Sequence, residues 1–275
     1  MREPFFSIII PCLNEEETLP HLFLDLEAQS LQDFEFIVVD GNSEDKTREI
    51  AKKFSKTLNG TLIVSDRRNV GYQRNLGAIK AKGRYLIFFD ADVHIEPEFL
   101  SGIQYFLIRD KIDSCTAWIQ TDGKHPSDKL FASFYNTVSD TMAAMSLPIA
   151  YGAFICAKKQ VFTKIKGFDS KIVHAEDIDF VRRVVDKNFK FAVLHEPLYT
   201  YSLRRYRKEG TLRLLRKLAP LSPQLLMNKK ITKPLEAYPM LGGKYFSENG
   251  NKKSTMSSLE TLVQALKFIL GEKKN

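Results

Sequence analysis

The first 110 residues alternate short apolar runs with amphipathic stretches, and this alternation limits the fold more than any other feature. The apolar runs lie at residues 5–10, 34–39, 61–65 and 84–89. Their length and their branched and aromatic side chains are typical of buried strands. The stretches between them have the apolar spacing of helices that cover a sheet. Repeated strand–helix units predict a parallel sheet with helices on both faces.

The second half of the chain has a less regular pattern. Strands are expected at residues 114–119, 149–157, 189–194 and 198–202, and helices at residues 127–145, 161–168 and 176–186. Pro197 is expected to separate the last two strands, because proline cannot donate a hydrogen bond to a neighbouring strand. The predicted fold class is α/β, with a mostly parallel central sheet flanked by helices.

Cysteine content and hydropathy narrow the class of protein. Cys12, Cys115 and Cys156 are widely spaced and form no Cys-x-x-Cys pair. This pattern argues against a disulfide framework or a structural zinc site and fits a reducing compartment. No uninterrupted apolar run reaches the length of a membrane span. We therefore expect a cytoplasmic protein.

Positive charge is concentrated in one segment of a chain whose formal net charge is +8. Residues 203–218 contain seven arginines and lysines against Glu209 as the single acidic residue. Such a cluster suits an anionic partner: a phosphate, an acidic membrane surface or nucleic acid. The competing interpretation is a solvated helix face.

A pair of carboxylates follows the fourth apolar run directly. Asp90 and Asp92 flank Ala91 at the end of this expected strand. In open α/β sheets, ligands bind at the carboxyl ends of the strands. Two carboxylates at this spacing suit a hard divalent cation that also holds phosphate oxygens. An ordinary surface turn is the alternative.

Polar residues also follow the first two strands, where a nucleotide base and ribose would lie if the phosphates sat at the carboxylate pair. The candidate contacts are Pro11, Asn14, Glu15, Asp40 and Asn42. Asn14 is also expected to cap the first helix, with Glu17 completing a capping box. Asp40 has the alternative interpretation of a turn residue.

Two further side chains have open interpretations. His94 follows Asp92 by two residues and is a candidate imidazole ligand for the same metal, or a solvent-facing loop histidine. Arg74 precedes the fourth strand and is a candidate partner for a phosphate or ribose, or for a surface carboxylate.

An acidic pair opens the helix expected at residues 176–186. Carboxylates are favoured at a helix start, so capping alone accounts for one or two of them. Near a phosphate site, one carboxylate can act as a general base. We assign this role to Asp177, with Glu176 as its supporting neighbour. Arg204 and Arg205 open the basic segment, and their guanidinium groups suit a departing diphosphate.

The ordered series of motifs resembles that of the family 2 glycosyltransferases. The segments that carry the likeness are residues 7–16, 38–47, 74–77, 81–83, 89–92, 167–169 and 176–177. Residues 202–205 also resemble a serine–arginine pair found in one branch of that family. The series spans roughly residues 5–205, about three quarters of the chain.

The resemblance implies a GT-A fold, a UDP- or GDP-sugar donor and a Mn²⁺ or Mg²⁺ ion held by Asp90 and Asp92. It also implies inversion at the anomeric carbon, with Asp177 deprotonating the acceptor hydroxyl. Relatives often carry Asp-Asp-Gly-Ser after the second strand, whereas residues 40–43 read Asp-Gly-Asn-Ser. A Gln-x-x-Arg-Trp motif for processive synthesis is missing from the sequence, which favours a single addition.

The resemblance also divides the chain. Residues 1–205 are expected to form the catalytic domain, with a nucleotide-binding half at about 1–110 and an acceptor-binding half at about 111–205. Residues 206–275 are expected to form a basic helical extension, with a basic helix at 209–218, a mobile polar stretch at 228–256 and an amphipathic helix at 259–270.

The expected acceptor is a glycan, a lipid or a polyprenyl phosphate, with no nucleic acid partner. Segments 204–218 and 259–270 are candidates for peripheral contact with an anionic membrane, on the inner face of the cell membrane. Two alternatives remain open. A sugar-phosphate nucleotidyltransferase would normally carry a glycine-rich loop after the first strand, and residues 11–14 are not one. A non-catalytic basic module would leave the acidic crevice unexplained.

Overall fold

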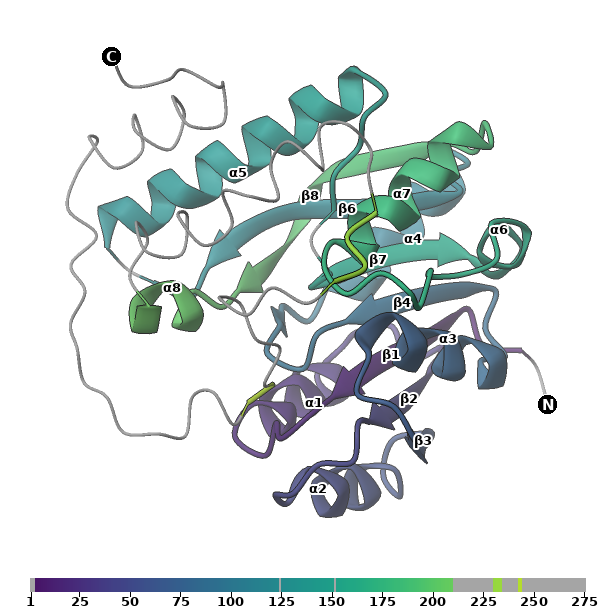
Figure 1. The fold of residues 1–275 in the computed structure, drawn as a ribbon, viewed down its shortest axis with the longest axis vertical. Helices are drawn as coiled ribbons and strands as arrows, with labels where there is room; N and C mark the ends of the chain where they lie inside the picture. Colours follow the sequence, from purple (N-terminus) through teal and green to yellow (C-terminus); the bar gives the residue numbers. More distant parts are fainter. Residues whose placement is uncertain (1–2, 124, 151, 210–229, 234–241, 244–275) are drawn as a thin grey trace.

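The computed structural model describes residues 3–123, 125–150, 152–209, 230–233 and 242–243. In this part of the chain, eight strands form one sheet in the order β3-β2-β1-β4-β7-β6-β8-β5 (Figure 1). The parallel half consists of β1 (Phe6–Cys12), β2 (Phe34–Asp40), β3 (Gly60–Val64) and β4 (Tyr85–Phe89). Helices α1 (Leu19–Glu27), α2 (Thr47–Phe54) and α3 (Val70–Lys80) alternate with these strands. The predicted strand–helix alternation is confirmed.

The second half of the chain turns the sheet into a mixed one. Strand β7 (Phe154–Lys158) runs antiparallel to β4 and to β6 (Ser114–Thr121), and β5 (His94–Ile95) runs antiparallel to β8 (Phe191–Tyr201). Strands β6 and β8 are parallel. The remaining helices are α4 (Phe99–Arg109), α5 (Pro126–Ala144), α6 (Lys159–Lys164), α7 (Glu176–Asp186) and α8 (Arg204–Glu209). Among the described strands, parallel pairings outnumber antiparallel ones by four to three.

One expectation for local structure is wrong, and one helix was not predicted. The predicted break at Pro197 is wrong, because β8 runs through this residue as one strand. Its pairing with β6 instead shifts register between Ala117 and Ile119, and proline is tolerated where a strand ladder is interrupted in this way. Helix α4 was not predicted, although Phe99, Ile103 and Leu107 give it a helical apolar face.

Alternate residues of the central strands supply two hydrophobic cores, one on each face of the sheet. Ile8 and Phe36 belong to the core under α1, α2 and α4, whereas Ile9 and Phe88 belong to the core under α3, α6 and α7. This follows from the two-residue period of a strand, and it explains why the central strands are buried at every position. Figure 1 shows α5 lying along β6 and β8.

The C-terminal elements are described only in part. Helix α8 covers Arg204–Glu209, a segment for which no helix was predicted, and it lies just before the basic helix predicted at 209–218. The predicted continuation to residue 218 and the predicted amphipathic helix at 259–270 lie outside the described residues, as does most of the predicted polar stretch at 228–256. The described residues contain no helix that is long and apolar enough to cross a membrane.

Candidate active site

The loops that follow β1 and β2 are joined by hydrogen bonds from backbone N–H groups of one loop to side-chain oxygens of the other. The Asn14 N–H donates to Ser43 Oγ at 2.9 Å, and Asn14 Oδ1 accepts from the Glu44 N–H at 2.8 Å. The Glu15 N–H donates to Thr47 Oγ1 at 2.8 Å. Asn14 has a φ of 55°, a left-handed conformation that asparagine tolerates better than most residues. These contacts fix two predicted binding loops as one rigid edge.

The predicted capping box is therefore wrong. Helix α1 begins at Leu19, and its N-cap is Thr18, whose side chain makes no capping bond. The Asn14 side chain is unavailable for capping because it binds the loop after β2. Thr18 Oγ1 donates instead to Glu15 Oε2 at 2.7 Å, which fixes the direction of that carboxylate.

Asp40 ends β2 with a fully buried side chain. Its Oδ2 accepts from the Ser43 N–H at 2.9 Å, whereas its Oδ1 is buried and has no hydrogen-bond partner in the described structure. A buried carboxylate oxygen without a donor is costly, so a ligand N–H or O–H would be bound favourably there. Asn42 lies beside it with an exposed side chain and a φ of 64°.

The Asp90–Asp92 turn leaves β4 at the same edge of the sheet. Ala91 is buried between the two carboxylates, and the Asp90 N–H donates to the Ala153 carbonyl at 3.3 Å. Asp90 Oδ1 lies 3.0 Å from Arg74, and Asp92 Oδ2 lies 3.0 Å from Arg204. The side chains are 39% and 26% exposed, so both keep surface that a ligand can reach.

The donor set at this turn suits a metal that is shared with a substrate. The described residues contain no cluster of three or more His, Cys, Asp or Glu side chains placed to hold a metal ion. Mg²⁺ and similar ions are often held by one or two carboxylates together with substrate phosphates. Asp90 and Asp92 fit that arrangement, with the rest of the coordination left to ligand and water.

His94 has a different partner from the one proposed for a ligand. Its Nδ1 lies 3.1 Å from Asp25 Oδ2 on α1, and its side chain is 47% exposed. The Ile95 N–H donates to the same carboxylate oxygen. A carboxylate on Nδ1 is also common for histidines that ligate a metal through Nε2, so this contact leaves both interpretations open. His94 does not, however, form a group of three possible ligands with Asp90 and Asp92 in the described structure.

The Arg74 side chain is buried between two carboxylates. Its side chain is 1% exposed, with Nη1 2.8 Å from Glu176 Oε1 and Nη2 3.0 Å from Asp90 Oδ1. Nη2 also donates to the Gly152 carbonyl at 2.9 Å. Arg74 therefore pairs with the partly exposed Asp90 as well as with the buried Glu176, and it joins the turn after β4 to the start of α7. Its contact with a phosphate or ribose stays a prediction.

The acidic pair occupies the first turn of α7, which packs on the sheet through Phe180. Burial, followed by the charge of the neighbouring Glu176 carboxylate, raises the pKa of Asp177 to about 7. The charge of Arg74 and the backbone N–H groups of Ile178 and Gly152 oppose the rise. Burial also raises the pKa of Glu176. A carboxylate that titrates near pH 7 is well matched to general-base catalysis.

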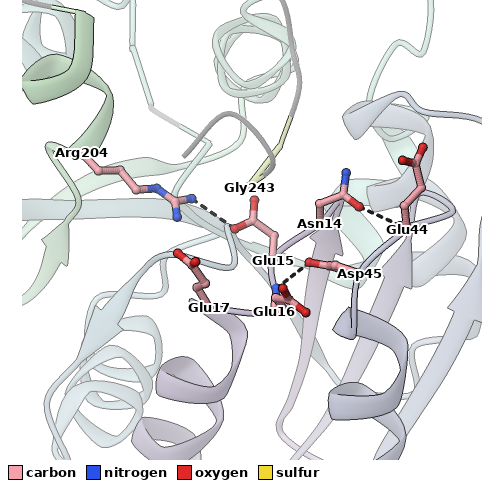
Figure 2. Close-up of a pocket in the computed structure, with 8 residues that line it drawn as sticks. All are labelled: Asn14, Glu15, Glu16, Glu17, Glu44, Asp45, Arg204 and Gly243. Atoms are coloured by element: carbon pink, nitrogen blue, oxygen red, sulfur yellow. Dashed lines mark hydrogen bonds and ion pairs between the residues drawn. The ribbon is translucent and has the colours of Figure 1, made fainter. Parts of the chain in front are cut away.

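Arg204 extends from α8 to the loop after β1. One of its nitrogens lies 3.2 Å from Glu15 Oε2 (Figure 2). The same nitrogen lies 3.0 Å from Asp92 Oδ2. Burial raises the pKa of Glu15 to about 7, although the Arg204 charge lowers it. Arg205 lies close enough to His174 for its charge to lower the pKa of that histidine, after the larger effect of burial.

A cavity of about 290 Å³ opens beside this contact (Figure 2). It is lined by Asn14, Glu15, Glu16, Glu17, Glu44, Asp45, Arg204 and Gly243. The sequence had singled out Asn14, Glu15 and Arg204 among these. Glu16, Glu44 and Asp45 were missed as site residues even though they lie inside the motif segments 7–16 and 38–47. The cavity is mostly acidic, with five carboxylates against Arg204 alone, and it lies at the carboxyl edge of the sheet, where α/β folds bind their ligands.

Comparison with known proteins decides the family. The model for glycosyl transferase family 2 matches residues 7–165, more than half of the chain. The chain belongs to glycosyl transferase family 2. Its fold is the GT-A fold of that family, and it is a glycosyltransferase.

Several relatives of this family 2 member are described by name. It is 22% identical over 210 residues to the glycosyltransferase AglE of Haloferax volcanii, covering 74% of this chain and 68% of the relative. It is 36% identical over 110 residues to a PGL/p-HBAD biosynthesis glycosyltransferase of Mycobacterium bovis, covering 39% of this chain and 43% of the relative. The chain thus spans less than half of the mycobacterial protein.

Solved structures of family relatives share its fold. A mannosyltransferase, PcManGT from Pyrobaculum calidifontis, in complex with GDP-Man and Mn²⁺, aligns with a TM-score of 0.65 at 18% identity, over 100% of this chain and 77% of that one. S. aureus TarS in complex with UDP-GlcNAc aligns with a TM-score of 0.58 at 20% identity, over 79% of this chain and 66% of that one. The chain spans just under two thirds of that TarS chain.

Proposed function

We propose that this glycosyltransferase moves a sugar from a nucleotide-diphosphate donor to a hydroxyl or phosphate acceptor, with a divalent metal and with inversion at the anomeric carbon. One observation carries the proposal. The buried Arg74 guanidinium bonds both Asp90 and Glu176, so the candidate metal ligands and the candidate base lie next to each other. Reaction at the donor diphosphate and proton removal from the acceptor would then take place in one site.

The donor side is proposed at the edge formed by the first two loops. The unpaired Oδ1 of Asp40 is an acceptor for a nucleobase N–H, and Pro11, Asn14, Glu15 and Asn42 lie in the same loops. The bound structures of relatives contain UDP-GlcNAc in one case and GDP-Man in another. We therefore propose a UDP- or GDP-sugar as the donor.

The diphosphate is proposed to lie at Asp90 and Asp92, which would hold Mn²⁺ or Mg²⁺. The PcManGT structure contains Mn²⁺. When bound, such an ion would neutralise charge on the diphosphate as the leaving group departs. Arg204, now 3.0 Å from Asp92, is placed to turn toward the departing phosphates, with Arg205 following it in the chain. His94 is left out of the proposed ligand set because, among the described residues, it forms no group of three possible ligands with Asp90 and Asp92.

The chemical step is proposed to be a direct displacement. The ionised Asp177 carboxylate accepts the proton of an acceptor hydroxyl as its oxygen forms a bond to the anomeric carbon. The bond from that carbon to the diphosphate oxygen breaks, and the nucleoside diphosphate leaves with the electron pair. Glu176 supports the base through its ion pair with Arg74. A phosphate acceptor would attack as its oxyanion and would need no base.

The acceptor is proposed to be a cell-envelope glycan or a lipid-linked molecule. The named relatives include a PGL/p-HBAD biosynthesis enzyme and a poly(ribitol-phosphate) β-N-acetylglucosaminyltransferase. The proposed catalytic unit is residues 1–205, and contact with an anionic membrane through 204–218 and 259–270 remains part of the proposal. No feature of the described residues favours a nucleotidyltransferase or a non-catalytic module instead.

A thermal-shift screen tests the donor and the metal together. The purified full chain is heated with UDP, GDP, dTDP or CMP, each with and without Mn²⁺. A ligand that binds only the folded state raises the melting temperature by mass action. The proposal predicts a rise with UDP or GDP that needs Mn²⁺ and that is lost in Asp92→Ala. A rise that is equal with and without Mn²⁺, or no rise with any nucleotide, would contradict it.

A further inference from the structure

We propose that Arg74 is a positioning residue that couples the donor-side carboxylate Asp90 to the acceptor-side pair Glu176 and Asp177. This inference rests on the proposed function, since it takes Asp90 as a metal ligand and Asp177 as the base. In this role Arg74 need not contact the donor itself. Binding of metal and donor at Asp90 would change the position of Glu176 and Asp177 on the acceptor side.

The first line of support is that one rigid group serves both carboxylates. Nη1 of Arg74 holds Glu176 at 2.8 Å, and Nη2 holds Asp90 at 3.0 Å. A guanidinium is planar, with its donors fixed relative to one another, so neither contact can change without disturbing the other. A cation bound at the Asp90 carboxylate would compete with Nη2 for its negative charge, which weakens the contact between Arg74 and Asp90.

The second line of support is the link through Gly152. Its carbonyl accepts from Arg74 Nη2 at 2.9 Å, and its N–H donates to the Asp177 carboxylate. The same peptide segment therefore connects the guanidinium to the proposed base. A Cβ on residue 152 would lie 2.4 Å from Arg74 Nη2, so glycine is required for this contact.

The third line of support is that the guanidinium has little room to move on its own. Its carbon lies 5.2 Å from the centre of the Phe168 ring, which is itself stacked on Phe180 of α7. Helix α3 comes close to β1 at Gly77, where a Cβ would lie 2.5 Å from Ile9 Cγ2. Because the Arg74 guanidinium is packed this closely, a movement of Asp90 would move the guanidinium and, with it, Glu176.

Coupling of this kind is reciprocal and can be measured at equilibrium. Glu176 and Asp90 share the positive charge of Arg74, so each weakens the ion pair that Arg74 forms with the other. In Glu176→Gln, Arg74 should pair more strongly with Asp90 and compete with the metal. The variant should therefore bind Mn²⁺–nucleotide more weakly, although Glu176 is not proposed to touch the donor.

A double-mutant cycle tests the assignment by calorimetric titration of UDP and of GDP into the full chain with saturating Mn²⁺. The proteins are wild type, Glu176→Gln, Arg74→Lys and the double variant. We expect Glu176→Gln to weaken binding about tenfold in the wild-type background and less than about twofold in the Arg74→Lys background, because a single ammonium cannot span both carboxylates. Equal effects of Glu176→Gln in both backgrounds would overturn the coupling.

A matched pair of glycine variants keeps every charge in place. Gly152→Ala pushes against Arg74, whereas the Cβ in Gly71→Ala meets ordinary contacts of 3.4 Å or more. Gly152→Ala should weaken Mn²⁺–nucleotide binding several-fold when each variant is titrated well below its own melting temperature, and Gly71→Ala should not. Identical affinities for the two variants would refute the positioning role. Absence of metal-dependent binding in wild type would instead refute the proposed function, and the coupling with it.

Discussion

Replacing Asp177 by asparagine should stabilise the protein while it stops transfer. The pKa of this carboxyl is raised from 3.8 to about 7, mainly by burial and then by Glu176. The folded state therefore binds a proton more tightly than the unfolded chain, and stability falls as the pH rises from about 4 to about 7. The asparagine side chain would carry no charge to bury, and its amide oxygen can still accept from the Ile178 N–H.

The expected gain in stability of Asp177→Asn can be worked out from the raised pKa of Asp177. A rise of about three pKa units, from 3.8 to about 7, corresponds to an upper limit of about 4 kcal/mol above pH 7. At pH 5 the gain should be less than half as large, because the folded-state carboxyl is still protonated there. A gain of even 1 kcal/mol would raise the melting temperature of a chain of this size by about 2 °C or more.

The assay compares melting curves of wild type and Asp177→Asn at pH 5 and pH 8. Asp179→Asn is the matched control, because Asp179 lies in the same first turn but pairs with Arg183 at 2.7 Å. The control should be unchanged or less stable than wild type at both pH values. If Asp177→Asn were destabilised at pH 8, Asp177 would be a helix cap and the reasoning from its burial would be refuted.

The remaining predictions concern the donor, the pH profile and the scaffold. Asp40→Asn should weaken nucleotide binding about tenfold in a titration, because it alters the acceptor left unpaired at Oδ1; an unchanged affinity would exclude Asp40 from the base contact. The value of kcat/KM should rise with pH and level off above about 7, as expected for a base that must be ionised; a profile that falls across pH 6–8 would contradict Asp177 as the base. Gly77→Ala should destabilise the fold by about 1–3 kcal/mol in denaturant titration, since its Cβ would lie 2.5 Å from Ile9 Cγ2. Stability equal to that of Gly71→Ala would show that α3 can move away from β1.

The sequence predicted those elements and site residues that depend on a short local pattern. The runs of β1, β2 and β4 are buried at every position because both faces of these strands are covered, so they could be recognised without knowing their partners. Asp90 and Asp92 could be selected for a similar reason, because they follow such a run directly. The start of α7 at Glu176 was also predicted correctly.

The contacts that organise the site could not be predicted in this way. Arg74 meets Glu176 across 102 positions of sequence, and a single chain gives no signal for such a pair. Asn14 looked like a helix cap because its local pattern is that of a cap, yet its side chain binds the loop after β2. The antiparallel direction of β7 likewise depends on how the chain crosses the sheet and not on the composition of the strand.

The most direct test of the account is the release of nucleoside diphosphate from the sugar donor, measured at pH 8 with Mn²⁺ and a hydroxyl acceptor that gives turnover. Wild type, Asp92→Asn and Asp177→Asn are compared for release and for donor binding. The account predicts that Asp92→Asn loses both, whereas Asp177→Asn keeps donor binding and loses release by a factor of about 10²–10⁴. Release by Asp177→Asn at the wild-type rate, or metal-dependent donor binding retained in Asp92→Asn, would contradict it.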